Sequence, residues 1–348
     1  MDPTTPYDAI LLVSFGGPEK RDDVVPFLEN VTRGRGVPRE RLLEVAEHYY
    51  HFDGVSPINA QNRALLAALR ALLDTRGPAL PVYWGNRNWR PSLTETVARM
   101  ADDGIRRALA FVTSAFASYS SCRQYLDDIA RARAEVGARA PTIDKLRLYW
   151  DHPGFIEPMV EHIEAALAAL PKDARGGAHL AFTAHSVPRA MAESSDYVAQ
   201  LEEASGLVTA RLRSRHPWAL VFQSRSGPPS QPWLEPDIRD HLAVLRAQNV
   251  TDVVLVPIGF VSDHLEVRWD LDTEAAARAR ELGMRLTRAA TVGTHPGFVA
   301  MIRELVLERA GDAPRRALGR GGPAPDVCAP GCCLSPAPPP VTPAAPRD

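Results

Sequence analysis

The stretch Val253-Val254-Leu255-Val256-Pro257-Ile258-Gly259-Phe260-Val261 is the longest apolar run of the chain, and the polar residues Ser262 and Asp263 follow it directly. A short apolar run with such boundaries is typical of a strand that is buried on both faces. Similar runs occur at residues 9–13, 81–84, 108–115, 180–184 and 219–223, and stretches with helical spacing separate them. Strands that alternate with helices predict parallel sheets covered by helices on both faces.

A short internal repeat indicates two similar halves. The sequence His-Pro-Gly-Phe at residues 152–155 recurs at residues 295–298, and each copy precedes a helical stretch. We therefore predict an α/β fold with two Rossmann-like halves around a central cleft. The first half would span residues 1–165 and the second 166–310, with the last helix able to pack back onto the first half. Residues 311–348 would form a tail rich in Pro and Cys.

The composition is that of a globular protein. Of 348 residues, 45% are apolar and 24% are charged, and the formal net charge is -2. This excludes a disordered or fibrous chain and argues against a nucleic acid as the partner, because binding phosphates needs a surplus of basic residues. No apolar stretch approaches the roughly 20 residues of a membrane-spanning helix. The first residues lack the basic and apolar regions of a signal peptide, so we expect a cytoplasmic protein.

The tail has a different composition from the rest of the chain. Ten of the 38 residues from 311 to 348 are proline, and the apolar periodicity is lost. Such a segment buries too little surface to offset the entropy of ordering it, so we predict that it is mostly flexible. Three of the four cysteines nevertheless lie in it, at positions 328, 332 and 333.

Three acidic residues follow the apolar run at helical spacing. Glu266, Asp270 and Glu274 are four residues apart and would form one column on a helix. One interpretation is a solvated helix face. The other is a row of oxygen ligands for a divalent cation. The position after a central strand, and the lack of Lys or Arg at i+4, favour the second interpretation.

His185 directly follows the apolar run at residues 180–184. Ligands of parallel α/β sheets bind at the carboxyl ends of the strands, so this residue is a candidate for chemistry. A single histidine at such a place can also be a hydrogen-bonded structural residue. If it faces a carboxylate from the neighbouring strand, it suits proton removal near neutral pH or ligation of a metal.

Further loops supply aromatic and anion-binding groups. They include Trp233 in the proline-rich stretch 223–236, Phe15 before a Gly-Gly pair, Arg33 beside Gly34, Ser56, and Tyr125. None of these loops resembles a GxGxxG or Walker motif, so nucleotide binding has little support.

In several of these stretches the chain resembles the ferrochelatases, which insert ferrous iron into a porphyrin. The most specific matches are Thr-Ala-His-Ser-Val-Pro at 183–188, Gln-Ser-Arg-Ser-Gly-Pro at 223–228 with Pro-Trp-Leu at 232–234, and Ser-Asp-His-Leu-Glu at 262–266. Residues 16–19, 54–57 and 83–85 support them in the same order, and the resemblance covers about residues 8–309. It implies a lyase of heme biosynthesis whose fold has two Rossmann-like halves around a cleft.

The resemblance also implies roles for the candidate residues near the metal. His185 and Glu266 match the pair that binds iron and accepts protons on one face of the macrocycle. Asp270 and Glu274 resemble the acidic ladder that leads metal to or from this pair.

Other positions match residues of the porphyrin pocket. Ser56 and Tyr125 match positions that contact the porphyrin or its propionates, and Arg33 is a weaker match of the same kind. Trp233 resembles an aromatic residue of the pocket wall. Phe15 lies where some relatives place a Tyr that approaches the metal, but Phe has no ligating atom. His48 stands where some relatives have Arg.

Some ferrochelatases hold a [2Fe–2S] cluster with one internal cysteine and three near the C-terminus. Cys122, Cys328, Cys332 and Cys333 resemble this pattern, and four thiolates are the number such a cluster needs. The alternatives are a zinc site or free thiols on a loose tail. The adjacent residues 332 and 333 can reach one cluster only if the backbone turns sharply, which Gly331 would allow.

Within the family the resemblance is to the actinobacterial type, whose expected substrates are coproporphyrin III and ferrous iron. The alternatives are a protoporphyrin IX ferrochelatase, a chelatase that inserts cobalt or nickel into another tetrapyrrole, or a protein that binds heme or metal without turnover. Transient contact with neighbouring enzymes of the heme pathway is the other partnership that the resemblance implies.

Overall fold

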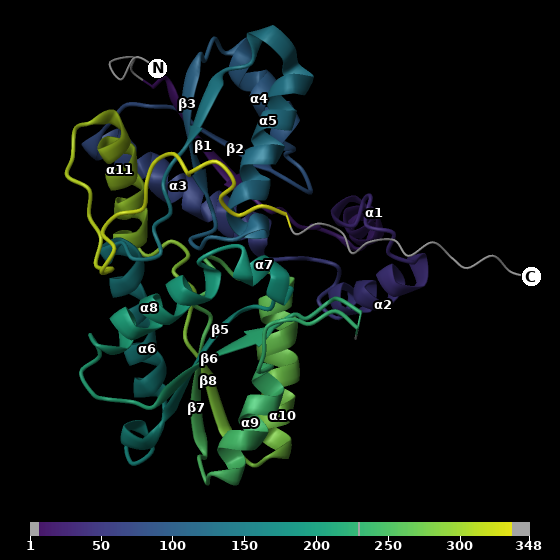
Figure 1. Ribbon diagram of the computed structural model, residues 1–348, viewed down its shortest axis with the longest axis vertical. Coiled ribbons are helices and arrows are strands. Elements are labelled where there is room, and N and C mark those ends of the chain that lie inside the picture. Colours follow the sequence, from purple (N-terminus) through teal and green to yellow (C-terminus); the bar gives the residue numbers. More distant parts are fainter. Residues whose placement is uncertain (1–6, 229, 336–348) are drawn as a thin grey trace, which may run out of the picture.

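The computed structural model describes residues 7–228 and 230–335, which contain two four-stranded parallel sheets (Figure 1). The sheets have the strand orders β2-β1-β3-β4 and β6-β5-β7-β8, so both halves have the same topology. The predicted α/β class with two Rossmann-like halves is confirmed. The strands are β1 (Ala9–Ser14), β2 (Val82–Asn86), β3 (Arg107–Val112), β4 (Thr142–Lys145), β5 (His179–His185), β6 (Trp218–Gln223), β7 (Asp252–Val256) and β8 (Arg285–Arg288).

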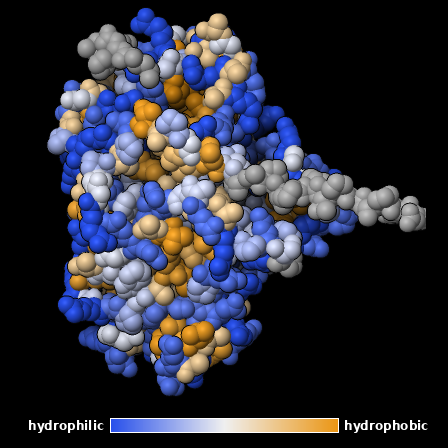
Figure 2. Space-filling view, in the orientation of Figure 1, coloured by the Kyte–Doolittle hydropathy of each residue, from blue (hydrophilic) through white to orange (hydrophobic). Residues whose placement is uncertain are grey.

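The central strands are buried on both faces. Every residue of β1 and β7 is buried, which explains why the sequence shows continuous apolar runs there instead of alternation. The sequence did not predict β4 and β8. Each is a four-residue strand at the edge of its sheet, without an apolar run. The face seen in Figure 2 is mainly hydrophilic, with hydrophobic residues in separate groups over both halves.

Helices cover both sheets, and two of them continue from π-helices. The α-helices are α1 (Arg21–Val31), α2 (Arg39–Tyr50), α3 (Ile58–Arg76), α4 (Leu93–Asp102), α5 (Gln124–Val136), α6 (Pro153–Ala169), α7 (Arg189–Glu193), α8 (Tyr197–Thr209), α9 (Ile238–Ala247), α10 (Ala276–Glu281) and α11 (Pro296–Ala310). The π-helix η1 (Tyr119–Arg123) leads into α5, and η4 (Val267–Ala275) leads into α10. Within the described residues, no helix is both long and apolar enough to span a bilayer.

The repeated His-Pro-Gly-Phe motif starts α6 and α11. In both copies the histidine accepts a hydrogen bond at Nδ1 from the glycine amide, over 3.0 Å at His152 and 3.1 Å at His295. The two helices pack against each other at these motifs. A Cβ atom at Gly154 would lie 2.6 Å from Cβ of Met301, so this approach requires glycine.

These two helices connect the halves. α6 follows the first sheet but packs on α8, β7 and β8, and α11 follows the second sheet but packs on α3. A boundary at residue 165 would cut α6. We therefore propose that the halves exchange their last helices and that the boundary lies before α6.

Residues 311–335 form no helix or strand, but they run across both halves at the yellow end of the ribbon in Figure 1. The amide of Leu318 donates to the backbone oxygen of Asp151, over 2.9 Å, and the amide of Arg320 donates to Glu203 on α8, over 2.7 Å. This differs from the flexible tail predicted from composition. Hydrogen bonds and ion pairs hold the segment, and these leave no apolar periodicity in the sequence. Residues 336–348 of the predicted tail lie outside the described residues.

Candidate active site

His185 and Glu266 face each other at the carboxyl ends of the neighbouring strands β5 and β7. His185 is the last residue of β5, and Glu266 directly precedes η4. The imidazole Nε2 of His185 lies 3.4 Å from a carboxylate oxygen of Glu266, and the two side chains are 33% and 48% exposed. The Nδ1 atom of His185 donates to the backbone oxygen of Ser186, which fixes the ring and leaves Nε2 toward the carboxylate.

The charges of His185 and Glu266 shift each other's pKa. Burial alone would lower the pKa of His185, but the negative charge of Glu266 outweighs burial and raises this pKa above its usual value. Burial would raise the pKa of Glu266, and the charge of His185 lowers it instead. At neutral pH the pair therefore holds one proton between its two members. Next to the pair lies His264, whose Nδ1 atom accepts a hydrogen bond of 3.2 Å from the Glu266 amide. Burial lowers the pKa of His264.

The acidic column predicted from the sequence lies on η4. Hydrogen bonds in a π-helix span five residues, so residues four apart still lie close to one turn apart. The hydroxyl of Ser224 donates to the carboxylate of Asp270. Burial, with the nearby charge of Glu266, raises the pKa of Asp270 to about 7. The outermost residue, Glu274, forms an ion pair of 3.1 Å with Arg239 of α9, a partner that spacing along η4 does not predict.

The first half contributes Phe15 and Tyr125. Phe15 follows β1, its side chain is exposed, and its ring packs edge-on against Phe27 at 6.3 Å. Tyr125 is buried in the first turn of α5. Arg87 lies between them, with its guanidinium 4.4 Å from the ring centroid of Tyr125 and 5.8 Å from that of Phe15. The structure thus brings two predicted pocket residues together through a third that the sequence did not identify.

A buried ion pair with Asp128 of α5 holds the side chain of Arg87. Its side chain is 4% exposed and it pairs with Asp128, which is 8% exposed. Burial raises the pKa of Tyr125, and the positive charge of Arg87 opposes this shift. Arg87 directly follows β2, so its place at the carboxyl end of a strand could have identified it. The same holds for Ser224, which directly follows β6 and has a φ of 64°.

Other predicted pocket residues are less closely connected to the pair. Ser56 is buried, and its hydroxyl would lie 2.9 Å from a Cβ atom at Gly17. Trp233 is buried and forms a backbone bridge with Pro188, three residues beyond His185. Arg33 is exposed in the turn after α1, where its side chain has no hydrogen bond or ion pair with the described residues.

His48 has a partner from the other half. Its ring stacks on Trp269 of η4, with centroids 4.2 Å apart and planes 9° from parallel. Burial lowers the pKa of His48, so the ring is neutral near pH 7. It therefore cannot replace the positive charge of an arginine at this position while the stack is formed.

The four cysteines are neighbours. Cys122 interacts with Cys328, which in turn interacts with Cys332, and the sulfurs of Cys332 and Cys333 are 3.4 Å apart. The predicted turn is present, since Gly331 has a φ of 83° and Cys333 a φ of 52°. Cys122 and Cys333 are buried, and Cys328 and Cys332 are partly exposed. No three His, Cys, Asp or Glu side chains of the described residues surround one point as a single metal ion requires.

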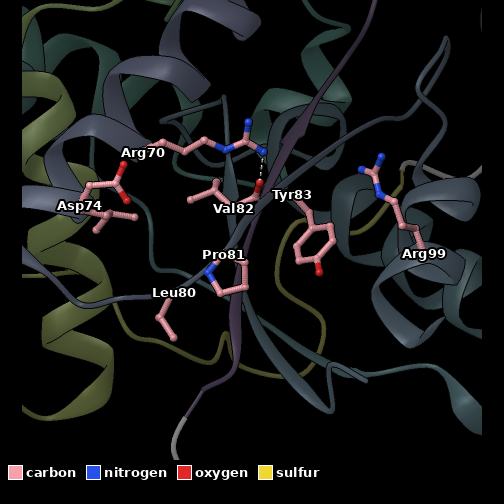
Figure 3. A pocket seen from close by; sticks show the side chains of 8 residues that line it. Arg70, Asp74, Leu80, Pro81, Val82, Tyr83 and Arg99 are labelled. Atoms are coloured by element: carbon pink, nitrogen blue, oxygen red, sulfur yellow. Dashed lines mark hydrogen bonds between the residues drawn. The ribbon is translucent and has the colours of Figure 1, made fainter. Parts of the chain in front are cut away.

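Two cavities are present among the described residues. One of about 430 Å³ lies beside the start of β2, between α3 and α4 (Figure 3). There Arg70 donates to the backbone oxygen of Val82 over 2.6 Å, and Arg99 lies on the far side of Tyr83. The second, of about 600 Å³, is lined by Asp263, Arg288 and residues 290–296, among others. Neither cavity is lined by His185 or Glu266.

Comparison with known proteins places the chain in a family. The sequence profile of the ferrochelatases matches residues 7–310. The chain belongs to the ferrochelatase family. It is 55% identical to the coproporphyrin III ferrochelatase of Streptomyces coelicolor, over 97% of this chain and 96% of that protein. It is 56% identical to the protein of the same name from Frankia alni, over 96% of this chain and 88% of that protein.

Another relative carries the family name alone. The ferrochelatase of Rhodopirellula baltica is 54% identical, over 98% of this chain and 97% of that protein. Among solved structures, SirB from Bacillus subtilis with Fe³⁺ has a TM-score of 0.55 and 12% sequence identity, covering 88% of this chain and 98% of that one. At this identity the likeness concerns the fold.

Proposed function

We propose that this ferrochelatase inserts ferrous iron into coproporphyrin III and releases two protons, to give Fe-coproporphyrin III. The observation that carries the proposal is the half-exposed His185–Glu266 pair, 3.4 Å apart at adjoining strand ends. The choice of coproporphyrin III among porphyrins rests on relatives of that name at 50–56% identity.

The reaction exchanges two protons for one divalent cation. A porphyrin loses its two N–H protons as iron bonds to the four nitrogens, so the net charge of the ring is unchanged. A positioned base must take these protons, and His185 paired with Glu266 is suited to this role. Since the pair already holds a proton at neutral pH, that proton has to leave before a pyrrole proton can enter.

We infer that Asp270 accepts the proton that leaves the His185–Glu266 pair. Its pKa of about 7 lets it accept and release a proton near neutral pH. Ser224 donates to its carboxylate, and Glu274 lies one step further along η4. We infer that this column carries protons outward, and that its carboxylate oxygens also suit ferrous iron on its way to the ring.

The four propionates of coproporphyrin III need polar or cationic partners. Arg33 and Arg35 lie exposed in the turn after α1, and neither side chain pairs with an acidic group of the described residues. We propose that this turn, with Ser56 and Tyr125, contacts the propionates, and that Phe15 and Trp233 contact the ring. Protoporphyrin IX has two propionates, so it would leave some of these contacts unused.

We propose that the four thiols hold a [2Fe–2S] cluster. Such a cluster takes two thiolates at each iron, so its ligands surround two centres rather than one. The contacts of Cys122 with Cys328 and of Cys332 with Cys333 suit this division. A zinc ion would need all four thiolates around one point. The interaction with Cys122 lowers the pKa of Cys328, which favours a thiolate at this position.

A steady-state assay with ferrous iron tests the function. We expect kcat/KM to be at least about tenfold higher with coproporphyrin III than with protoporphyrin IX, within the range that site contacts can discriminate. A higher value with protoporphyrin IX would reassign the substrate. Turnover only with cobalt or nickel would indicate a different chelatase. Tight porphyrin binding without any turnover would indicate a binding protein.

A further inference from the structure

A buried ion pair anchors the segment that carries the three C-terminal cysteines. Arg147, which follows β4, and Glu308 of α11 are 1% and 4% exposed, and their side chains form two hydrogen bonds of 2.8 and 3.0 Å. Both partners also bind the backbone of Arg316. Arg147 donates to its carbonyl over 2.7 Å, and its amide donates to Glu308 over 3.1 Å. The segment thus completes the hydrogen bonding of a charge pair that is hidden from solvent.

The contacts continue along the next residues. A Cβ atom at Gly319 would lie 2.8 Å from the Asp151 carboxylate and 3.0 Å from the ring of Trp150, so the backbone sits directly on two buried side chains. Gly321, two residues on, has open space around the corresponding position. The amide of Arg320 then donates to Glu203 of α8, in the second half.

A second set of ion pairs lies just before the first C-terminal thiol. Asp326 pairs with Arg309 at 3.6 Å and with Arg315 at 3.4 Å. Cys328 is two residues further on and contacts Cys122. The ion pairs of Asp326, like the contacts of Arg316, Gly319 and Arg320, involve no sulfur atom. The segment between α11 and the thiols is therefore held at both ends by groups that need no metal.

We propose that residues 312–327 form a strap that docks without a metal, and that this docking brings the C-terminal thiols to Cys122. In many small metal sites the ion orders the chain around it, because the unfolded chain has no preformed site. Here the strap would order the site first. Loading of the thiols would follow folding, whichever metal or cluster they take.

The test uses Cys122 as a single reporter. In a chain with Cys328→Ser, Cys332→Ser and Cys333→Ser, one thiol remains, so no cluster or zinc site can form. The alkylation rate of Cys122 with iodoacetamide is measured in the folded chain and in urea. We expect the folded chain to react roughly 100-fold more slowly, because the docked strap protects the thiol.

Two matched variants in the same background locate the anchor. Gly319→Val places a side chain against Asp151 and Trp150 and should raise the alkylation rate about tenfold or more, with faster tryptic cleavage after Arg316 and Arg320. Gly321→Val should leave both rates unchanged. Far-UV circular dichroism of each variant shows whether the rest of the chain is folded.

Two results would overturn the proposal. If Cys122 in the folded single-cysteine chain reacted nearly as fast as in urea, the thiols or their metal would be what holds the strap. If Gly319→Val left the alkylation and cleavage rates at the level of Gly321→Val, the anchor would not lie at Asp151. Neither readout depends on iron insertion, so failure of the proposed enzymatic function would appear separately, in the steady-state assay.

Discussion

The His185 imidazole lies 3.4 Å from the Glu266 carboxylate, although each residue belongs to a different βα unit. β5 and β7 pair from His179–Val253 to Phe182–Val256, so their carboxyl ends lie side by side, and both residues lie beyond the paired segment. Each group shifts the pKa of the other, so the two act as one proton-binding unit.

The first prediction concerns His185. His185→Ala should abolish iron insertion while the chain stays folded, because the face of the porphyrin would lose both a base and a ligand. Anaerobic assays with ferrous iron, alongside circular dichroism, measure this. His216→Ala is a matched control, since His216 binds the backbone oxygen of Ala178 near the opposite end of β5 and should not affect turnover. Wild-type turnover by folded His185→Ala protein would remove this residue from the mechanism.

The second prediction separates the members of the acidic column. Glu266→Gln should lower kcat by about 10²-fold or more, as expected when a general base is lost. Asp270→Asn should raise the apparent KM for ferrous iron and, because it also removes the proposed route for protons, lower kcat by less than Glu266→Gln does. Initial rates over a range of iron concentrations distinguish the two effects. If both variants matched the wild type, the column would be a solvated helix face.

Much of this arrangement could be predicted from the sequence, because strands buried on both faces leave continuous apolar runs and the residues after them meet at one edge of a sheet. This pattern predicted that His185 and Glu266, with the acidic column that continues along η4, follow strands of the second sheet, as the structure has them. It did not find the edge strands β4 and β8, which have no such runs. Arg87 directly follows β2, but its contacts with Asp128 and Tyr125 of α5 could not be predicted from the sequence.

The third prediction tests Arg87 as a positioning residue. Arg87→Lys keeps the positive charge but loses the planar group that stacks on Tyr125. We expect the KM for the porphyrin to rise about tenfold with a smaller change in kcat, because we propose that Tyr125 contacts the propionates and not the metal. Thermal unfolding should change little, since Asp128 keeps its pair with Arg131 at 2.7 Å. A fall in kcat with an unchanged KM would contradict this role.

The C-terminal segment shows where composition misleads. Proline content and the loss of apolar periodicity predicted flexibility, but Arg147, Glu308 and Gly319 hold residues 312–327 through backbone hydrogen bonds and close packing. Such contacts leave no pattern in the sequence. The sharp turn at Gly331 was predictable, because two adjacent thiols cannot otherwise face one site.

The fourth prediction concerns the thiols. Protein purified without oxygen should be red-brown and contain two irons and two acid-labile sulfides per chain, as a [2Fe–2S] cluster requires. Changing any one of the four cysteines to Ser should remove the colour. Iron, zinc and sulfide analyses of the wild type and of Cys122→Ser provide the measurement. Stoichiometric zinc in place of iron, or a cluster that survives Cys122→Ser, would rule out this ligand set.

The last prediction concerns stability and pH at Asp151, a buried carboxyl group beneath the strap. Burial raises its pKa from 3.8 to about 6, against the opposing charge of Arg147. The folded pKa lies above the unfolded one. The stabilising contribution of this group to the free energy of unfolding is therefore fully present below about pH 4 and is lost as the pH rises through 6. The loss amounts to roughly 3 kcal/mol of unfolding free energy. The asparagine of Asp151→Asn cannot ionise. The free energy of unfolding of the variant, relative to that of the wild type, should therefore increase by about this amount from pH 4 to pH 7. Urea unfolding at both pH values measures it, and a difference that stays constant with pH would show that the carboxyl group is not buried in this state.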